Sequence, residues 1–159
     1  MATPVSRDTV QAFLQAFASR DPGRIGPFLH DDVRWNIVGP VELIKFCGEW
    51  CGKATVLDLF SRIIPGVIKM TGYDPEQVLV DGDRCAVLAR MSGIKPDTGR
   101  AISYRCTQFV RFKDGKVIDY QSITDTFDAA EQLVGHPFDV GDDTGMPGPV
   151  VGRDVVALL

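Results

Sequence analysis

The chain has 159 residues, a length typical of one domain whose core can enclose a small cavity. Hydrophobic residues make up 45% and charged residues 24%, as in ordinary globular proteins. The net charge of −4 argues against a nucleic-acid partner, because phosphates would be repelled. No apolar run reaches the roughly 18 residues of a membrane helix, and no basic and apolar leader opens the chain. We therefore expect a cytoplasmic protein with no membrane partner.

The chain has four cysteines, a residue type that can bind metal ions. Cys47 and Cys51 form a C-x₃-C pair, but no second pair or nearby histidine completes a zinc set. Cys85 and Cys106 stand alone in the sequence. We therefore expect free thiols, no metal site and no cofactor.

Two helices are predicted before residue 33. The first has Ser6 at its N-cap and an apolar stripe at helical spacing, formed by Val10, Phe13, Leu14 and Phe17. Asp21 and Pro22 open a short second helix, which His30-Asp31-Asp32 ends.

A strand, a loop and a third helix follow. Residues 33–38 are predicted as a strand that carries Trp35, and residues 39–52 as a loop rich in Gly and Pro. Residues 53–64 have the clearest helical pattern, and Pro65-Gly66 is predicted to end that helix.

After residue 66 the apolar period changes to two, which indicates strands. The predicted strands are 67–70, 77–80, 84–91, 101–112 and 116–124. Asp81-Gly82 and Asp114-Gly115 are hairpin signals, and residues 95–99 form a longer turn, so the strands make an antiparallel meander. Asp125 is predicted to cap a last short helix.

Helices followed by a curled meander indicate an α+β fold. Residues 1–135 form the predicted domain, and residues 136–159 a Gly- and Pro-rich tail. A strongly curved sheet with helices on its concave side leaves a cone, whose floor suits a small ligand.

Several stretches share the pattern of a known family. They are the strand tryptophan Trp35, the run GEWCGK at 48–53 before an apolar helix, VDGDR at 80–84, FVRFKDGKVI at 109–118 and TDTF at 124–127. With these motifs the chain resembles the SnoaL-like branch of the NTF2-like superfamily over about residues 6–135. The resemblance implies a cone of N-terminal helices on a strongly curved antiparallel sheet. It does not imply one activity, because the fold hosts many.

Enzymes of this family place an acidic residue inside the cone. The resemblance puts Ser122 where limonene epoxide hydrolases have an inward aspartate. The interior of the strand 84–91 offers only Arg90 as a charge. Residues 35–38, where ketosteroid isomerases carry a base, contain no carboxylate. The epoxide-hydrolase Asp/Arg/Asp set is therefore absent.

Strand parity and the resemblance together select the candidate pocket residues. The ligand-binding candidates are Trp35, Trp50, Tyr104, Cys106, Gln108, Tyr120 and Ser122. Catalytic residues are not identified; the candidates are Tyr104 as an oxyanion donor, Arg90 if it faces inward, and Glu49 (or Glu42) from the loop beside the mouth. Strand parity does not decide whether Arg90 points into the cone or away from it. The alternative for Tyr104 is a structural position at the edge of the core.

Two functions of different classes remain open. The first is binding of a small hydrophobic or aromatic ligand without catalysis. The second is isomerase, cyclase or dehydratase chemistry on a hydrophobic carbonyl compound. A carboxylate pointing into the cone would favour the enzyme. We also expect a homodimer through the outer sheet face, where Arg105, Thr107, Phe109 and Arg111 would lie.

Overall fold

The structure is a computed structural model and describes residues 3–138. Its elements follow in the order α1 (Arg7–Ser19), α2 (Pro22–Ile25), the 3₁₀ turn η1 (Gly26–Phe28), β1 (Leu29–Val38), β2 (Gly48–Cys51), α3 (Lys53–Asp58), the π-helical turn η2 (Leu59–Ile63), α4 (Ile64–Val67), β3 (Lys69–Asp81), β4 (Arg84–Ile94), β5 (Ala101–Lys113), β6 (Lys116–Thr124) and α5 (Thr126–Val134).

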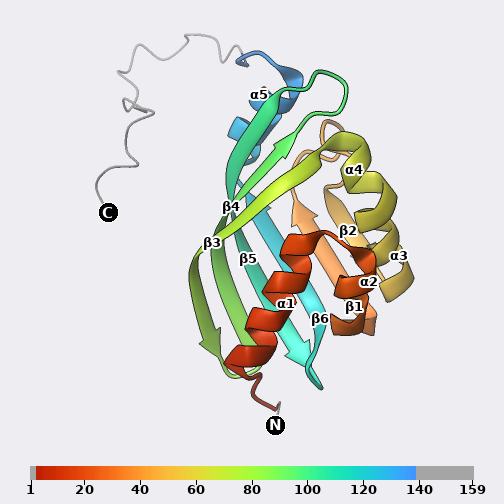
Figure 1. The fold of residues 1–159 in the computed structure, drawn as a ribbon, viewed down its shortest axis with the longest axis vertical. Helices are drawn as coiled ribbons and strands as arrows, with labels where there is room; N and C mark the ends of the chain where they lie inside the picture. The colour runs from red at the N-terminus through yellow and green to blue at the C-terminus, as the bar shows by residue number, and fades with distance from the viewer. Residues whose placement is uncertain (1–2, 139–159) are drawn as a thin grey trace.

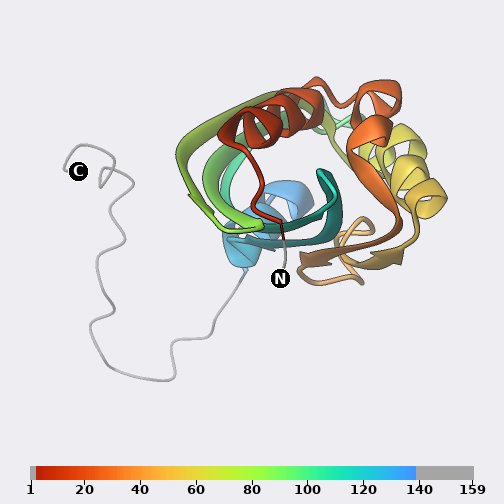
Figure 2. The same cartoon turned by 90° about the horizontal axis from the view of Figure 1, so that it is seen from below.

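One curved six-stranded sheet organises the molecule, in the order β2-β1-β6-β5-β4-β3. β1 and β6 run parallel, and the other neighbouring strands are antiparallel. Figure 1 shows α1 lying across the sheet with α3 and α4 beside it, and Figure 2 shows that these helices cover the concave side. The predicted α+β class, with N-terminal helices on a curved sheet, is therefore confirmed.

The predicted caps at Ser6 and Asp125 and the predicted turn at Asp114-Gly115 are present, whereas the β3–β4 hairpin turns at Gly82-Asp83, one residue later than predicted. Ser6 accepts a 3.0 Å hydrogen bond from the amide of Thr9, which starts α1. Asp125 accepts one from the amide of Asp128, which starts α5. At the β5–β6 turn, Asp114 and Gly115 both have positive φ, 52° and 73°, as a primed hairpin turn requires.

The third helix runs past the proline that was predicted to end it. The amide of Ile64 donates to the carbonyl of Leu59, five residues earlier, which makes η2 a π-helical turn. Pro65 lies in the first turn of α4, directly after the π-helical turn, and it does not end the helical segment. The helical segment therefore continues to Val67, which was predicted to start a strand.

Two strand boundaries also differ from the prediction. β1 begins at Leu29, which was placed in the second helix, and its register with β6 shifts between Leu29 and Arg34. The irregularity hides the period-two pattern at this end of the strand. β2 occupies residues predicted as loop; it is only four residues long, too short for periodicity to reveal it.

β3 is one strand where two were predicted. Its register with β4 shifts between Met70 and Gly72 and again between Pro75 and Gln77. Such bulges break the alternation of side chains, and Pro75 is tolerated because β3 is an edge strand. The second bulge turns Glu76 toward two arginines of the outer face, and its carboxylate lies 2.8 Å from Arg105 Nη2.

The core fills the space between the helices and the concave face. On β4 and β5 buried and more exposed side chains alternate strictly. Among residues 3–138, no helix is long and apolar enough to cross a membrane. Most of the predicted tail, residues 139–159, lies outside the described residues.

Candidate functional site

The floor of the cone is an aromatic pair on the two parallel strands. Trp35 of β1 and Tyr120 of β6 are register partners, so their side chains leave the same face side by side. Their ring centroids lie 3.5 Å apart and their planes differ by 7°. Both residues are buried, with 1% and 2% of their surface exposed.

Helix side chains close the space above this pair. Phe17 of α1 lies 6.1 Å from Trp35, and Phe60 of η2 meets the indole edge-on at 5.4 Å, both measured between ring centroids. These positions follow from the sequence, because the apolar stripe of α1 and that of the third helix both face the sheet.

A small cavity remains among these rings, with a volume of about 30 Å³, enough for one or two water molecules. Its lining residues come from α1, β1, η2, α4, β4, β5, β6 and the loop before β2. They are Phe17, Arg20, Trp35, Ile37, Phe46, Phe60, Ile64, Met91, Tyr104, Cys106, Tyr120, Ser122 and Thr124. No carboxylate is among them, so the described lining is apolar or hydroxylic apart from one arginine.

The titratable groups of the lining stay protonated at neutral pH. Burial raises the pKa of the Tyr104 and Tyr120 phenols well above their ordinary value. Burial also raises the pKa of the Cys106 thiol, to about 11. A general base needs a pKa near the working pH, and the described lining contains none.

Five of the seven ligand-binding candidates lie together on this cavity. They are Trp35, Tyr104, Cys106, Tyr120 and Ser122. Trp50 does not line it; its Nε1 donates to the carbonyl of Phe46, which fixes the loop before β2. Gln108 is buried next to the cavity, where its Oε1 accepts a 2.7 Å hydrogen bond from Tyr73. That any of these residues touches a ligand stays a prediction.

Two of the three catalytic candidates lie outside the cavity. Glu49 is exposed on β2, and Glu42 is exposed on the preceding loop. Arg90 shares the outer face of β4 with Leu88, and its Nε lies 3.7 Å from the Glu76 carboxylate. The direction that strand parity left open is therefore outward. Tyr104 alone lines the cavity, 5% exposed.

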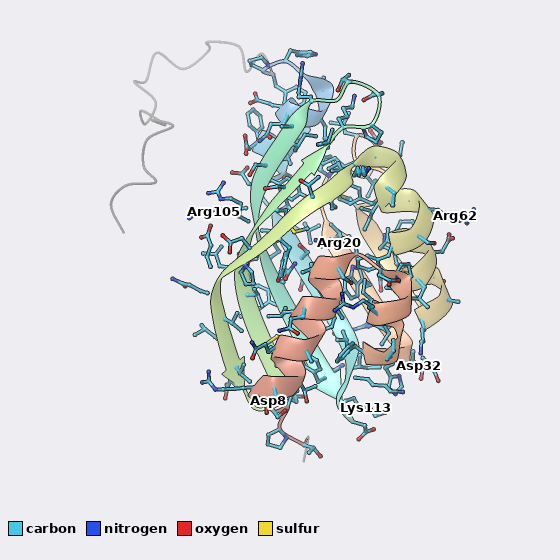
Figure 3. The ribbon with its side chains drawn as sticks, in the orientation of Figure 1. Asp8, Arg20, Asp32, Arg62, Arg105 and Lys113 are labelled. Atoms are coloured by element: carbon cyan, nitrogen blue, oxygen red, sulfur yellow. The ribbon has the colours of Figure 1, made fainter. Side chains whose placement is uncertain are left out.

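The lining contains one charged residue that the sequence reasoning missed. Arg20 follows α1 directly, at its C-cap, with a left-handed φ of 58° (Figure 3). Its guanidinium lies 4.1 Å above the centroid of Phe17, and Nη2 donates to the sulfur of Met91 at 3.3 Å. Arg20 is spaced three residues from Phe17, as the apolar stripe of α1 would continue, but it lies past the last helical residue, so the stripe alone does not predict its inward direction.

The described residues contain no cluster of potential metal ligands. Within residues 3–138 no three His, Cys, Asp or Glu side chains are grouped as a metal site requires. The four cysteines are free, and only Cys51 is exposed.

Solved structures with the same fold were found by comparison. A candidate isomerase from Rhodopseudomonas palustris is 31% identical, with a TM-score of 0.70 over 80% of this chain and 93% of that one. An NTF2-like protein of unknown function from Burkholderia pseudomallei is 25% identical, with a TM-score of 0.66 over 74% and 88% of the two chains. An epoxide hydrolase from M. tuberculosis, similar to limonene epoxide hydrolases, shares the fold at 18% identity, with a TM-score of 0.64 over 80% and 88%.

Sequence comparison gives a family assignment. Comparison with curated proteins yields no match. The family model of the SnoaL-like domain matches residues 10–120, well over half of the chain. The NTF2-like cone expected from the sequence motifs is thereby confirmed, and the chain belongs to the SnoaL-like domain family.

Proposed function

We propose that the protein binds a small, flat, hydrophobic molecule on the Trp35–Tyr120 pair and does not itself perform acid–base chemistry on it. The observation that carries this proposal is the lining of the cavity, which combines stacked aromatic rings with hydroxyl groups and holds no carboxylate among the described residues. Apolar walls with a few polar groups are typical of small-molecule sites.

A ligand larger than water requires one wall to move. The best candidate is Phe46, because it lies on the irregular segment between β1 and β2 and is 8% exposed. The backbone hydrogen bonds of this segment are local, such as those from Leu43 and Ile44 to the carbonyl of Pro40. Outward movement of Phe46 would open the cavity without breaking the sheet.

Binding is tested by calorimetric titration of the full chain with benzene-sized aromatic probes, in the wild type and in Phe46→Ala. Burial of apolar surface predicts a negative heat-capacity change. An engineered apolar cavity of about 150 Å³ holds benzene in another protein, so the enlarged cavity of the variant should accept such a probe. Absence of binding to both proteins contradicts the proposal.

An isomerase, cyclase or dehydratase acting on a hydrophobic carbonyl compound is the second candidate, favoured by the 31% identity to the R. palustris protein. Tyr104 would donate a hydrogen bond to the developing oxyanion, and a water held by the Ser122 hydroxyl would take the proton from the carbon next to the carbonyl. Incubation with cyclohex-2-enone in deuterated buffer tests this candidate. Enzyme-dependent exchange of the protons next to the carbonyl, lost in Tyr104→Phe, would establish it against the binding proposal.

We further propose a homodimer through the outer sheet face. Exposed apolar side chains gather there, with Leu79 69%, Phe109 48% and Ile123 46% exposed. Ion pairs frame them, formed by Glu76 with Arg105 on one side and by Asp119 with Arg34 on the other. A face with both charge signs and an apolar centre can be complementary to a second copy of itself about a two-fold axis.

A further inference from the structure

Arg20 lines the cavity without an acid beside it. Within residues 3–138, its guanidinium has no carboxylate oxygen within 4.0 Å, whereas six other arginines do. The six are Arg34, Arg62, Arg84, Arg90, Arg105 and Arg111. Arg7, Arg24 and Arg100 also have no carboxylate partner among these residues, but of the four unpaired arginines only Arg20 lines the cavity.

The present contacts of Arg20 satisfy few of its donors. A guanidinium has five N–H groups, and the one side-chain hydrogen bond described for it goes to the Met91 sulfur, a weak acceptor. The guanidinium makes cation–π contacts with Phe17 and Tyr73, whose ring centroids lie 4.1 and 5.9 Å from its Cζ. Arg20 is half-buried, and this partial burial lowers the pKa of its guanidinium. Such a cation gains more from an anion than an exposed one does.

The neighbouring polar groups are also donors. The Nε1 of Trp35 is buried without an acceptor among the described residues. The phenols of Tyr104 and Tyr120 keep their protons, because burial raises their pKa. A cavity lined by donors and one cation, with no anion of its own among the described residues, is complementary to a ligand that brings acceptors and a negative charge.

We propose that Arg20 is the anion-recognising residue of this cavity, and that the ligand is a flat hydrophobic molecule with one negatively charged group, a carboxylate or an enolate. This inference rests on the proposed function, since it names the class of ligand that the Trp35–Tyr120 floor receives. The ring of the ligand lies against the aromatic floor, and its charged group lies at the end of α1.

Three probes of one size test the inference by calorimetric titration at neutral pH. Benzoate is the anion, nitrobenzene its neutral analogue of nearly the same shape, and benzylammonium the cation. Each is titrated into the full-length wild type and into Phe46→Ala. Benzoate should bind about tenfold or more tightly than nitrobenzene, as expected for a hydrogen-bonded charge, and benzylammonium should bind least.

Variants at Arg20 separate recognition from a structural role. Arg20→Gln should abolish the preference for benzoate over nitrobenzene, and Arg20→Lys should keep part of that preference. Both keep a non-glycine residue at the left-handed position, so the backbone strain is the same. Arg24→Gln, which removes an exposed arginine of α2, is the control for net charge and should bind as the wild type does.

The outcomes distinguish the two proposals. Equal affinity of the wild type for benzoate and nitrobenzene overturns the role of Arg20 and leaves the proposed function standing. Binding of none of the probes to either protein overturns both. If Arg20→Gln does not fold, the ¹⁵N–¹H signal of the Arg20 guanidinium in the wild type decides: it should shift with benzoate and not with nitrobenzene, and the absence of a benzoate shift contradicts the inference.

Discussion

The phenol of Tyr73 on the edge strand β3 reaches across β4 to Gln108 of β5 and donates to its Oε1 at 2.7 Å. Gln108 is 1% exposed, and its Nε2 has no partner among the described residues. The amide is thus held by a single hydrogen bond in an apolar setting, which makes that bond more important than an exposed one.

Removal of the hydrogen bond between Tyr73 and Gln108 should destabilise the folded protein. Tyr73→Phe leaves both polar atoms of the Gln108 side chain without a protein partner, and we expect a loss of about 1–3 kcal/mol in the free energy of unfolding, measured in urea. The double variant Tyr73→Phe/Gln108→Leu removes both polar partners and should recover much of that loss. An unchanged single variant would show that water already satisfies the amide.

Shortening Phe46 should destabilise the protein and enlarge the cavity. The residue is 8% exposed and lines the cavity, so Phe46→Ala is expected to lower the free energy of unfolding by about 3–5 kcal/mol. Phe127→Ala, at a residue that is 51% exposed, is the matched control and should change it by about 0.5 kcal/mol or less. Equal effects of the two substitutions would mean that Phe46 is not a wall of the core.

Stability should fall in alkali because of buried thiols. Burial raises the pKa of Cys85 and Cys106 from 9.0 to about 11. Between pH 9 and 11 the folded state keeps its thiol protons, whereas the unfolded chain loses them. The thiols' contribution to the free energy of unfolding is therefore complete below pH 9 and declines as the pH rises through 9 toward 11. Urea unfolding between pH 7 and 10 measures the decline.

Cysteine variants identify the source of that decline. Above pH 9, the free energy of unfolding of Cys106→Ala should fall less steeply with pH than that of the wild type, by up to about 1.4 kcal/mol per pH unit. Cys51→Ala removes the exposed thiol and should leave the slope as it is. A slope that Cys106→Ala does not change would assign the decline to other groups.

A charge at the centre of the outer face should separate the proposed dimer. Phe109 is 48% exposed between Arg111 and Thr107 on β5, and in a two-fold interface each copy would meet the other near this residue. Sedimentation velocity should give a dimer for the wild type and a monomer for Phe109→Arg, with unchanged circular dichroism. A wild type that stays monomeric at micromolar concentration refutes the dimer.

Much of the fold was predictable because its signals are local. The stripes of α1 and the third helix, the caps Ser6 and Asp125, and the turn at Asp114 each depend on a few neighbouring residues. The errors lie where the geometry is irregular: a π-helical turn carries the chain past Pro65, and bulges in β3 interrupt the alternation that reveals a strand.

The site was predictable in part for a related reason. Strand parity and the family resemblance together predicted that Tyr104, Cys106 and Ser122 face inward, and in the structure all three line one cavity. Arg20 was missed because it follows the last helical residue, where a charge is usually solvated. Its unusual positive φ and its position over Phe17 depend on tertiary packing, which no local pattern encodes.

The parallel pairing of β1 with β6 has a consequence for how the cavity comes into being. Trp35 lies in the first third of the chain and Tyr120 in the last, so their contact closes a very long loop and requires β6, which is synthesised after β1 to β5. During synthesis, the helices and β1 leave the ribosome with an unfinished floor. Recognition of a ligand is therefore a property of the finished fold, and any ligand present early can act only on molecules whose last strand has already docked.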